Sequence, residues 1–303
     1  MDISPHKSDF VNVNGIRLHY LDWGGNGPVL LFLTGLGNSA HIYDDFAPRF
    51  TDQFHVLALT RRGHGESDYP ETGYDVDTLT EDVRLFMDEL KIEQAILVGH
   101  SIAYIEQCRF TAFYPERVSK LIFLDAAYDR TRFKVFAEKN PLKDIKLPEQ
   151  DCYTIEEYIV YTKSIHPSLA EMWSGLWDEE TRYCVKTGLD GKVMDKTSDE
   201  INGMIIDGSR NYVPEDSGIQ VPMLSFYAIW SNDSFPDYLT EEQKALLIEF
   251  HNNVRLPVQR ECIEQFKQNA PHARVIEILK GNHYCFIKHE ELVFDEMRKF
   301  LLP

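Results

Sequence analysis

A serine at position 101 stands where the chain can present a nucleophile. It follows the apolar run 95–98 closely, and Gly99 and Ala103 lie two residues to either side. This order predicts a strand, a sharp turn and a helix, and a turn tight enough to project a hydroxyl group needs small neighbours. In the pattern Gly-x-Ser-x-Gly the last position is here an alanine. A serine hydroxyl is a poor nucleophile at neutral pH, so it needs a base.

A histidine and a carboxylate follow in the order that a serine triad requires. His283 comes shortly after a predicted strand at 275–279, and Asp233 follows a predicted strand at 221–228. The histidine would take the serine proton, and the carboxylate would hold the imidazole in the correct tautomer. Asp125 also follows a predicted strand and is the alternative acid. We favour Asp233 for this position.

Two backbone N–H groups must stabilise the oxyanion that forms when the serine attacks a carbonyl group. Ile102, the residue after the serine, is expected to supply one of them. The second is expected from Leu36, which lies between Gly35 and Gly37 in the loop after a predicted strand at 29–33. Glycines at such a place let the backbone approach a ligand closely.

Short motifs spread over most of the chain are more specific together than any one of them. They are LTGLG at 33–37, TRRGHGESD at 60–68, GHS at 99–101, YPERV at 114–118, LDA at 124–126 and GNH at 281–283. With these motifs the chain resembles the α/β-hydrolase superfamily, in the branch of serine esterases that carry a helical cap. Thr34 departs from the histidine usual before the oxyanion glycine, and Ala103 departs from the final glycine of the elbow.

The alternation of apolar runs with helical stretches predicts an α/β protein. Apolar runs without polar alternation are typical of buried parallel strands. From 128 to 220 this alternation stops and the pattern becomes helical. We therefore expect an α/β-hydrolase fold, with a mostly parallel central sheet flanked by helices. The core domain would comprise residues 1–127 and 221–303, and a helical cap, residues 128–220, would be inserted after the sixth strand.

The predicted cap is rich in aromatic side chains. A cap over an apolar cleft presents part of its aromatic surface to the substrate, although each of these side chains can instead belong to the core of the cap itself. A closed aromatic pocket would favour small to medium uncharged esters. The substrate-binding residues expected on this basis are Tyr153, Tyr158, Tyr161, Trp173 and Trp177.

Charge and composition exclude several classes of partner. The chain has 303 residues and a net charge of −18, which argues against a nucleic-acid partner and disfavours a strongly anionic substrate. Its five cysteines follow no metal-ligand spacing and predict reduced thiols. The N-terminus lacks an apolar signal core, and no apolar run approaches the length of a membrane span. We expect a cytoplasmic protein without a membrane partner, cofactor or metal; the oligomeric state stays open.

These observations predict a serine hydrolase, carboxylesterase-like, that cleaves small to medium uncharged carboxylic esters through an acyl-enzyme intermediate. Serine at position 101 argues against the dehalogenases and epoxide hydrolases of the same fold, which need an aspartate there. A lactonase, amidase, carbon–carbon hydrolase or acyltransferase would use the same triad. A small-molecule receptor of this fold can keep the triad without turnover, and it is the alternative of a different class.

Overall fold

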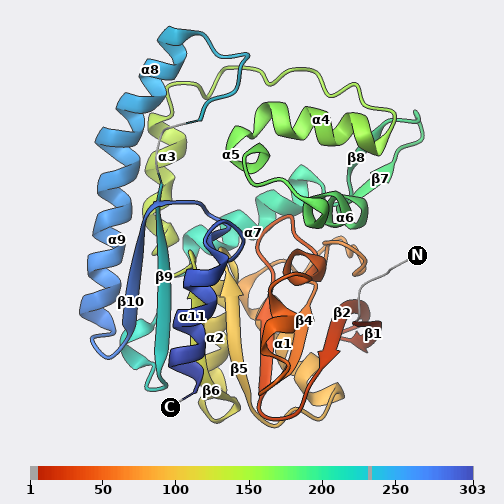
Figure 1. The fold of residues 1–303 in the computed structure, drawn as a ribbon, viewed down its shortest axis with the longest axis vertical. Helices are drawn as coiled ribbons and strands as arrows, with labels where there is room; N and C mark the ends of the chain where they lie inside the picture. The colour runs from red at the N-terminus through yellow and green to blue at the C-terminus, as the bar shows by residue number, and fades with distance from the viewer. Residues whose placement is uncertain (1–5, 231–233, 303) are drawn as a thin grey trace.

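The computed structural model describes residues 6–230 and 234–302, and an eight-stranded sheet forms its centre (Figure 1). The strand order is β1-β2-β4-β3-β5-β6-β9-β10. β2 pairs antiparallel with β1 and with β4, and the other neighbouring strands are parallel, so the mostly parallel sheet is confirmed. The strands are β1 Lys7–Val13, β2 Ile16–Gly24, β3 Val29–Leu33, β4 His55–Leu59, β5 Ala95–His100, β6 Val118–Leu124, β9 Met223–Trp230 and β10 Arg274–Gly281.

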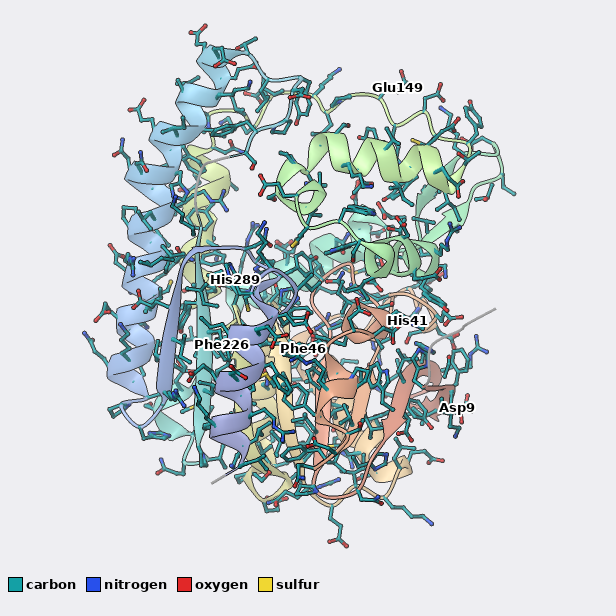
Figure 2. All side chains as sticks on the ribbon, in the orientation of Figure 1. Asp9, His41, Phe46, Glu149, Phe226 and His289 are labelled. Carbon is teal, nitrogen blue, oxygen red and sulfur yellow. The ribbon has the colours of Figure 1, made fainter. Side chains whose placement is uncertain are left out.

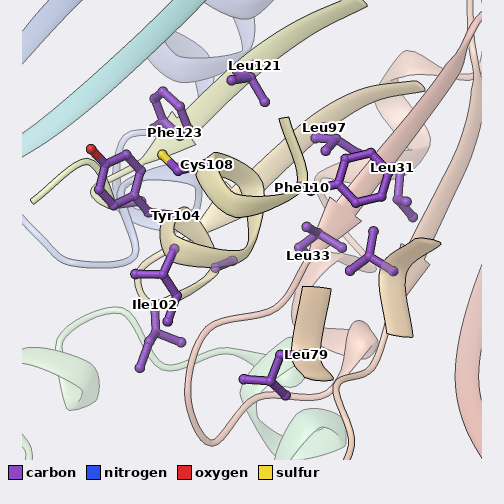
Figure 3. Close-up of a cluster of buried hydrophobic side chains, with 14 of the residues drawn as sticks. Leu31, Leu33, Leu79, Leu97, Ile102, Tyr104, Cys108, Phe110, Leu121 and Phe123 are labelled. Atoms are coloured by element: carbon purple, nitrogen blue, oxygen red, sulfur yellow. The ribbon is translucent and has the colours of Figure 1, made fainter. Parts of the chain in front are cut away.

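Helices cover both faces of this sheet, because successive strand residues point to opposite faces and both sets are apolar. Leu31 and Leu33 of β3 join the cluster under α1, α2 and α9, whereas Leu30 and Phe32 join the cluster under η1, η2, α10 and α11. Figure 3 shows where strand side chains such as Leu97 pack with those of α2 in the first cluster. These helices are α1 Val76–Glu89, α2 Ala103–Phe113, α9 Leu256–Asn269, η1 Ala40–Tyr43, η2 Ala47–Phe50, α10 Cys285–Lys288 and α11 Glu290–Leu301.

Between β6 and β9 the chain leaves the sheet and forms a layer beyond the carboxyl ends of the strands (Figure 1). We call residues 128–220 the cap segment. It is mainly helical, but it also contains an antiparallel ribbon, β7–β8, that the sequence analysis did not predict. Its elements are η4 Arg130–Phe133, α3 Lys134–Lys139, α4 Ile155–Ile165, α5 Pro167–Ala170, α6 Gly175–Cys184, β7 Val185–Thr187, β8 Val193–Asp195, α7 Asp199–Asn211 and η5 Asp216–Gly218.

A long helical run after β9 rises beside the cap segment (Figure 1). It consists of α8 Glu241–Phe250, a π-helical turn at His251–Arg255 and α9. The side chains of Thr240 and Gln243 form the capping box at which α8 begins. In the described part of the chain, neither this run nor any other helix has the length and apolar character needed to cross a bilayer.

A buried carboxylate fastens the cap segment to the core. Glu180 of α6 is 2% exposed and accepts hydrogen bonds from the backbone N–H of Ser39 at 2.8 Å, from Asn38 Nδ2 at 3.1 Å and from the Ser39 hydroxyl. Burial raises the pKa of Glu180, while these donors oppose the shift. Asn38 and Ser39 belong to the loop after β3, so α6 is bonded directly to the loop that carries Leu36.

A second contact between cap segment and core centres on the buried side chain of His41 (Figure 2). The ring of His41 stacks on that of Tyr183 with 3.5 Å between centroids. Its Nδ1 lies 2.8 Å from Asp44 Oδ2, and its Nε2 lies 3.9 Å from Glu66 Oε2. Burial alone would lower the pKa of His41, but the two carboxylates prevail and raise it to about 9. His41 is therefore an imidazolium at neutral pH.

This charge predicts a loss of stability on the alkaline side of neutrality. A folded-state pKa of about 9 lies above the ordinary value of 6.5, so the stabilisation is complete below pH 6.5 and disappears as the pH rises towards 9. The upper limit of the effect is roughly 3 kcal/mol. We expect the melting temperature of the wild type to fall over this interval, and that of His41→Gln to fall less.

The matched control for this prediction is His272→Gln, because His272 is exposed on the surface. The melting temperature of His272→Gln should fall with rising pH as steeply as that of the wild type. This wild-type slope also contains the contribution of every other group that titrates between pH 6.5 and 9. Equal slopes for wild type and His41→Gln in differential scanning calorimetry would contradict the assignment of the charge to His41. The pKa values of Asp44 and Glu66 are lowered, so these carboxylates change the stability only at acid pH, outside the interval compared here.

Candidate active site

Ser101 occupies the sharp turn between β5 and α2. Its φ is 56°, a left-handed conformation that is strained for a residue with a side chain. A Cβ added at Gly99 would lie 2.0 Å from Gln107 Oε1 and 3.1 Å from the Cβ of Ala103, so the turn does require small neighbours. The turn holds the hydroxyl of Ser101 at the carboxyl edge of the sheet, as the motif predicted.

Two hydrogen bonds connect Ser101 through His283 to a buried aspartate. His283 Nε2 lies 2.9 Å from Ser101 Oγ, and His283 Nδ1 lies 2.7 Å from Asp125 Oδ2. Asp125 is fully buried, and it also accepts the hydroxyl of Tyr128 at 2.5 Å and the backbone N–H of Ala228 at 2.9 Å. These donors fix the carboxylate in the position from which it orients the imidazole.

Among the described residues, the acid that contacts His283 is Asp125, which the sequence offered as the alternative to Asp233. β6 is the direct neighbour of β5 in the sheet, with Leu124 paired to His100, so the residue after β6 lies beside Ser101. β9 is one strand further away. Asp233 itself lies outside the described residues.

A second histidine, His100, holds the loop that carries His283. The Nε2 of His100 lies 3.0 Å from the backbone oxygen of His283. Burial lowers the pKa of His100 well below its ordinary value, so the ring is neutral and Nε2–H is the donor. A Cβ at Gly35 would lie 2.5 Å from Nδ1 of the same ring. The sequence analysis quoted His100 only as part of a motif and missed this role.

The two expected oxyanion donors face a small cavity next to the nucleophile. Leu36 and Ile102 both line it together with Ser101. Neither backbone N–H donates to another residue of the described chain, so both remain available to a ligand. The buried Arg61 fixes the loop from behind, because its guanidinium donates to the oxygen of Thr34 at 2.8 Å and to the oxygen of Gly35 at 3.1 Å.

A cavity of about 870 Å³ opens beside Ser101 and His283. It lies between the sheet, the cap segment and the upper part of the run α8–α9, and the last of these was not expected to contribute. Its apolar wall consists of side chains from η4, α3, α5 and residues 235–250, whereas its polar wall carries several cations. The apolar side chains are Phe133, Phe136, Leu169, Phe235, Leu247 and Phe250.

None of the five aromatic residues expected to bind substrate lines this cavity. Tyr158 and Tyr161 belong to a small apolar cluster inside the cap segment. Trp173 and Trp177 pack against the core cluster under α10 and α11, and Tyr153 is 54% exposed. The expectation failed because helical periodicity shows that α4 has an apolar face but does not show what packs against that face. Its partner is the ribbon β7–β8, which was not predicted.

The polar wall of the cavity has a charge opposite to that of the chain. Arg130, Arg210 and Arg255 line it, with Lys280 and Lys288 at its edge. The Nη2 of Arg130 lies 3.2 Å from Ser101 Oγ. These arginines could not be recognised from the net charge of −18, because a total charge contains no information about position. The only local signal is that Arg130 follows Asp125 closely.

Two groups of histidines and carboxylates have donor atoms close enough to hold a metal ion. His6, His41 and Asp44 form one, and His19, His41 and Glu66 form the other. Neither group contributes to either cavity beside the nucleophile. The chemistry of that site therefore has to be derived from the side chains around Ser101.

Comparison with known proteins supports a resemblance over the first half of the chain. Residues 28–174 match the family model described as alpha/beta hydrolase fold. A 132-residue stretch is 33% identical to 2-(acetamidomethylene)succinate hydrolase of Mesorhizobium japonicum, and it covers 41% of this chain and 48% of that protein. The match therefore spans about half the length of this curated relative.

Solved structures resemble the chain over almost its whole length. The crystal structure of E-2-(acetamidomethylene)succinate hydrolase superposes with a TM-score of 0.74 at 20% identity, and it covers 98% of this chain and 99% of that one. A thioesterase domain from the curacin biosynthetic pathway superposes with a TM-score of 0.70 at 17% identity, with 97% and 99% covered. At these identities the likeness concerns the fold, which includes the layer over the strand ends.

Proposed function

The chain belongs to the α/β-hydrolase superfamily, and from this premise we propose that it is a serine hydrolase that cleaves small to medium carboxylic esters. The observation that carries the proposal is the continuous contact from Ser101 Oγ through His283 to Asp125, at 2.9 and 2.7 Å. Such a constellation serves to activate a hydroxyl group as a nucleophile.

The reaction would run through an acyl-enzyme. Ser101 Oγ attacks the ester carbonyl while His283 Nε2 accepts the hydroxyl proton. Asp125 stabilises the imidazolium, and the N–H groups of Leu36 and Ile102 stabilise the oxyanion. The C–O bond to the alcohol breaks, and the alkoxide takes the proton from His283. Water then attacks the acyl group with His283 as base, and Ser101 recovers its proton as the acid departs.

The same steps cleave a thioester, a lactone or an amide, so the scissile bond is part of the proposal. Two of the similar proteins support a hydrolase whose scissile bond is not limited to an ester. One relative is a hydrolase of 2-(acetamidomethylene)succinate, and one structural neighbour is a thioesterase domain. The apolar wall of Phe133, Phe136 and Phe250 suits a compact acyl or alcohol group of a few carbon atoms. A receptor on the same fold would contain the triad but release no product.

The test combines turnover with labelling of the nucleophile. We expect the protein to release many equivalents of 4-nitrophenol from 4-nitrophenyl butyrate. We also expect a fluorophosphonate to add one label, which mass spectrometry should locate on the peptide that contains Ser101. Release of a single equivalent or less, with Ser101 labelled, would favour the receptor. Absence of both reactions in the folded protein would contradict the proposed function.

A further inference from the structure

Arg130 and Arg210 of the cavity differ from the arginines outside it. Each arginine outside the cavity forms an ion pair with an aspartate or a glutamate. Arg130 and Arg210 form no ion pair with any described residue, although acidic residues outnumber basic ones by 49 to 31. In so acidic a chain, two arginines without a carboxylate partner beside the nucleophile require an explanation.

Arg130 has most of its hydrogen-bonding capacity unused. A guanidinium carries five N–H donors and cannot accept. Within the described residues its one hydrogen bond goes from Nη2 to Ser101 Oγ, and its buried Nε has no acceptor. The negative charge of the nearby Asp125 raises the pKa of Arg130 against the effect of burial, but the hydrogen bond of Arg130 goes to Ser101 and not to this carboxylate. Burial lowers the pKa of Arg130 to about 10, which leaves it positively charged at neutral pH.

Arg210 adds a second positive charge to the cavity lining next to Ser101. It comes from the last turn of α7, and it lines both cavities next to the nucleophile, as Arg130 does. Among the described residues that line the cavity, the one carboxylate belongs to Glu171. It is engaged at the edge of the cavity, by the hydroxyl of Ser234 and by Lys288 at 3.7 Å. Glu171 therefore does not neutralise Arg130 or Arg210.

Guanidinium groups held without an acceptor in a partly enclosed cavity are costly unless a ligand supplies an anion. A guanidinium matches a carboxylate in plane and spacing, and the pair is stronger than a neutral hydrogen bond. We propose that the substrate of this site carries a carboxylate, which Arg130 and Arg210 bind while Ser101 attacks an ester carbonyl of the same molecule. This inference rests on the proposed function and specifies its substrate class.

The geometry limits the distance between the two groups of such a substrate. Arg130 Nη2 is 3.2 Å from the attacking oxygen, so the carboxylate and the scissile carbonyl are separated by only a few carbon atoms. A half-ester of a short dicarboxylic acid meets this requirement, and its carbon chain can contact Phe133 and Phe136. The expectation of an uncharged substrate followed from the predicted aromatic pocket of the cap and from the net charge of the whole chain, and neither describes this cavity.

The test compares two esters that differ in charge but not in shape. In ethyl hydrogen glutarate and ethyl 5-methylhexanoate, a carboxylate and an isopropyl group occupy the same position. We expect the wild type to favour the anionic ester in kcat/KM, measured as release of ethanol, by about 10- to 100-fold. Arg210→Gln and Arg130→Gln should each reduce this ratio towards one, and Arg210→Lys should keep part of it. A wild-type preference for the neutral ester would overturn the proposal.

Arg182→Gln is the matched control, because Arg182 lies on the outer surface of α6 and pairs with Glu156. It should leave the ratio at the wild-type value. If both cavity variants lowered the two rates equally and kept the ratio, Arg130 and Arg210 would act on the reacting carbonyl, and the carboxylate assignment would be wrong. Thermal unfolding of each variant shows whether the fold is intact.

Protection of Ser101 from the fluorophosphonate separates this inference from the proposed function. Glutarate should slow labelling in the wild type by at least several-fold, whereas its neutral diamide, glutaramide, at equal ionic strength should not. Labelling without protection by glutarate would overturn the carboxylate site and leave the serine hydrolase standing. Protection by inorganic phosphate but not by glutarate would assign the arginines to a phosphate. Failure of labelling altogether would count against the proposed function itself.

Discussion

Ser101→Ala is expected to lower kcat/KM for any ester that the protein turns over by roughly 10³- to 10⁶-fold. The variant lacks the oxygen that attacks the carbonyl group, and His283 then has no proton to accept at 2.9 Å. Only the oxyanion donors and substrate binding would remain, and these account for the residual rate of such variants. Initial rates with 4-nitrophenyl butyrate, at enzyme concentrations raised for the variant, measure the loss.

Ser119→Ala is the matched control for this prediction. Ser119 lies near the start of β6, at the opposite end of the sheet from the turn, and its hydroxyl donates to the oxygen of Ala95. Its removal should leave the rate within about twofold of the wild type, since it touches no reacting group. If folded Ser101→Ala keeps more than a tenth of the activity, another residue is the nucleophile.

Asp125→Asn is expected to cost about 10⁴-fold in kcat, because an amide in place of the carboxylate favours the wrong tautomer of the histidine. The carboxylate of Asp125 accepts the N–H of His283 Nδ1 at 2.7 Å. An asparagine can turn its NH₂ group towards that nitrogen, and Nε2 would then carry the proton and could not accept one from Ser101. The rate of fluorophosphonate labelling should fall in parallel.

The comparison with Asp233→Asn decides between the two acids that the sequence offers. We expect this variant to keep the wild-type rate within a factor of a few. A loss of several orders of magnitude in Asp233→Asn, together with near-normal activity in Asp125→Asn, would reverse the assignment. Asp125 also holds Tyr128 and the backbone of Ala228, so unfolding temperatures must accompany the rates.

The residues that the sequence identified correctly are those whose role depends on adjacent positions. Ser101 was found from a strand, small neighbours and a helix, all within a few residues, and the left-handed φ of 56° agrees with that pattern. Local sterics decide these features, and the local sequence contains them.

The features that the sequence missed depend on which segments become neighbours in space. The choice between Asp125 and Asp233 follows from the order of strands in the sheet, since β6 and not β9 adjoins β5. Both alternatives were visible in the sequence, and tertiary contacts selected between them.

The arginines of the cavity show the same limit for charge. Arg130 and Arg210 are 80 residues apart in the numbering, in η4 and α7, and no periodic pattern connects them. Composition gives a strongly acidic chain, and only the fold gathers these cations beside the nucleophile. The net charge therefore describes the outer surface and not the chemistry of the interior.

The bond between Glu180 and the loop after β3 has a consequence for exchanging the cap segment between relatives. Glu180 is the acceptor for Asn38 and Ser39, which lie in the same loop as Leu36, the proposed oxyanion donor. A grafted cap segment without a carboxylate at this position would leave buried donors unpaired, at a cost of about 1–3 kcal/mol each. The cap segment is therefore not an independent module: a chimera made to change the substrate range would also have to carry over the group that keeps the core ready for catalysis.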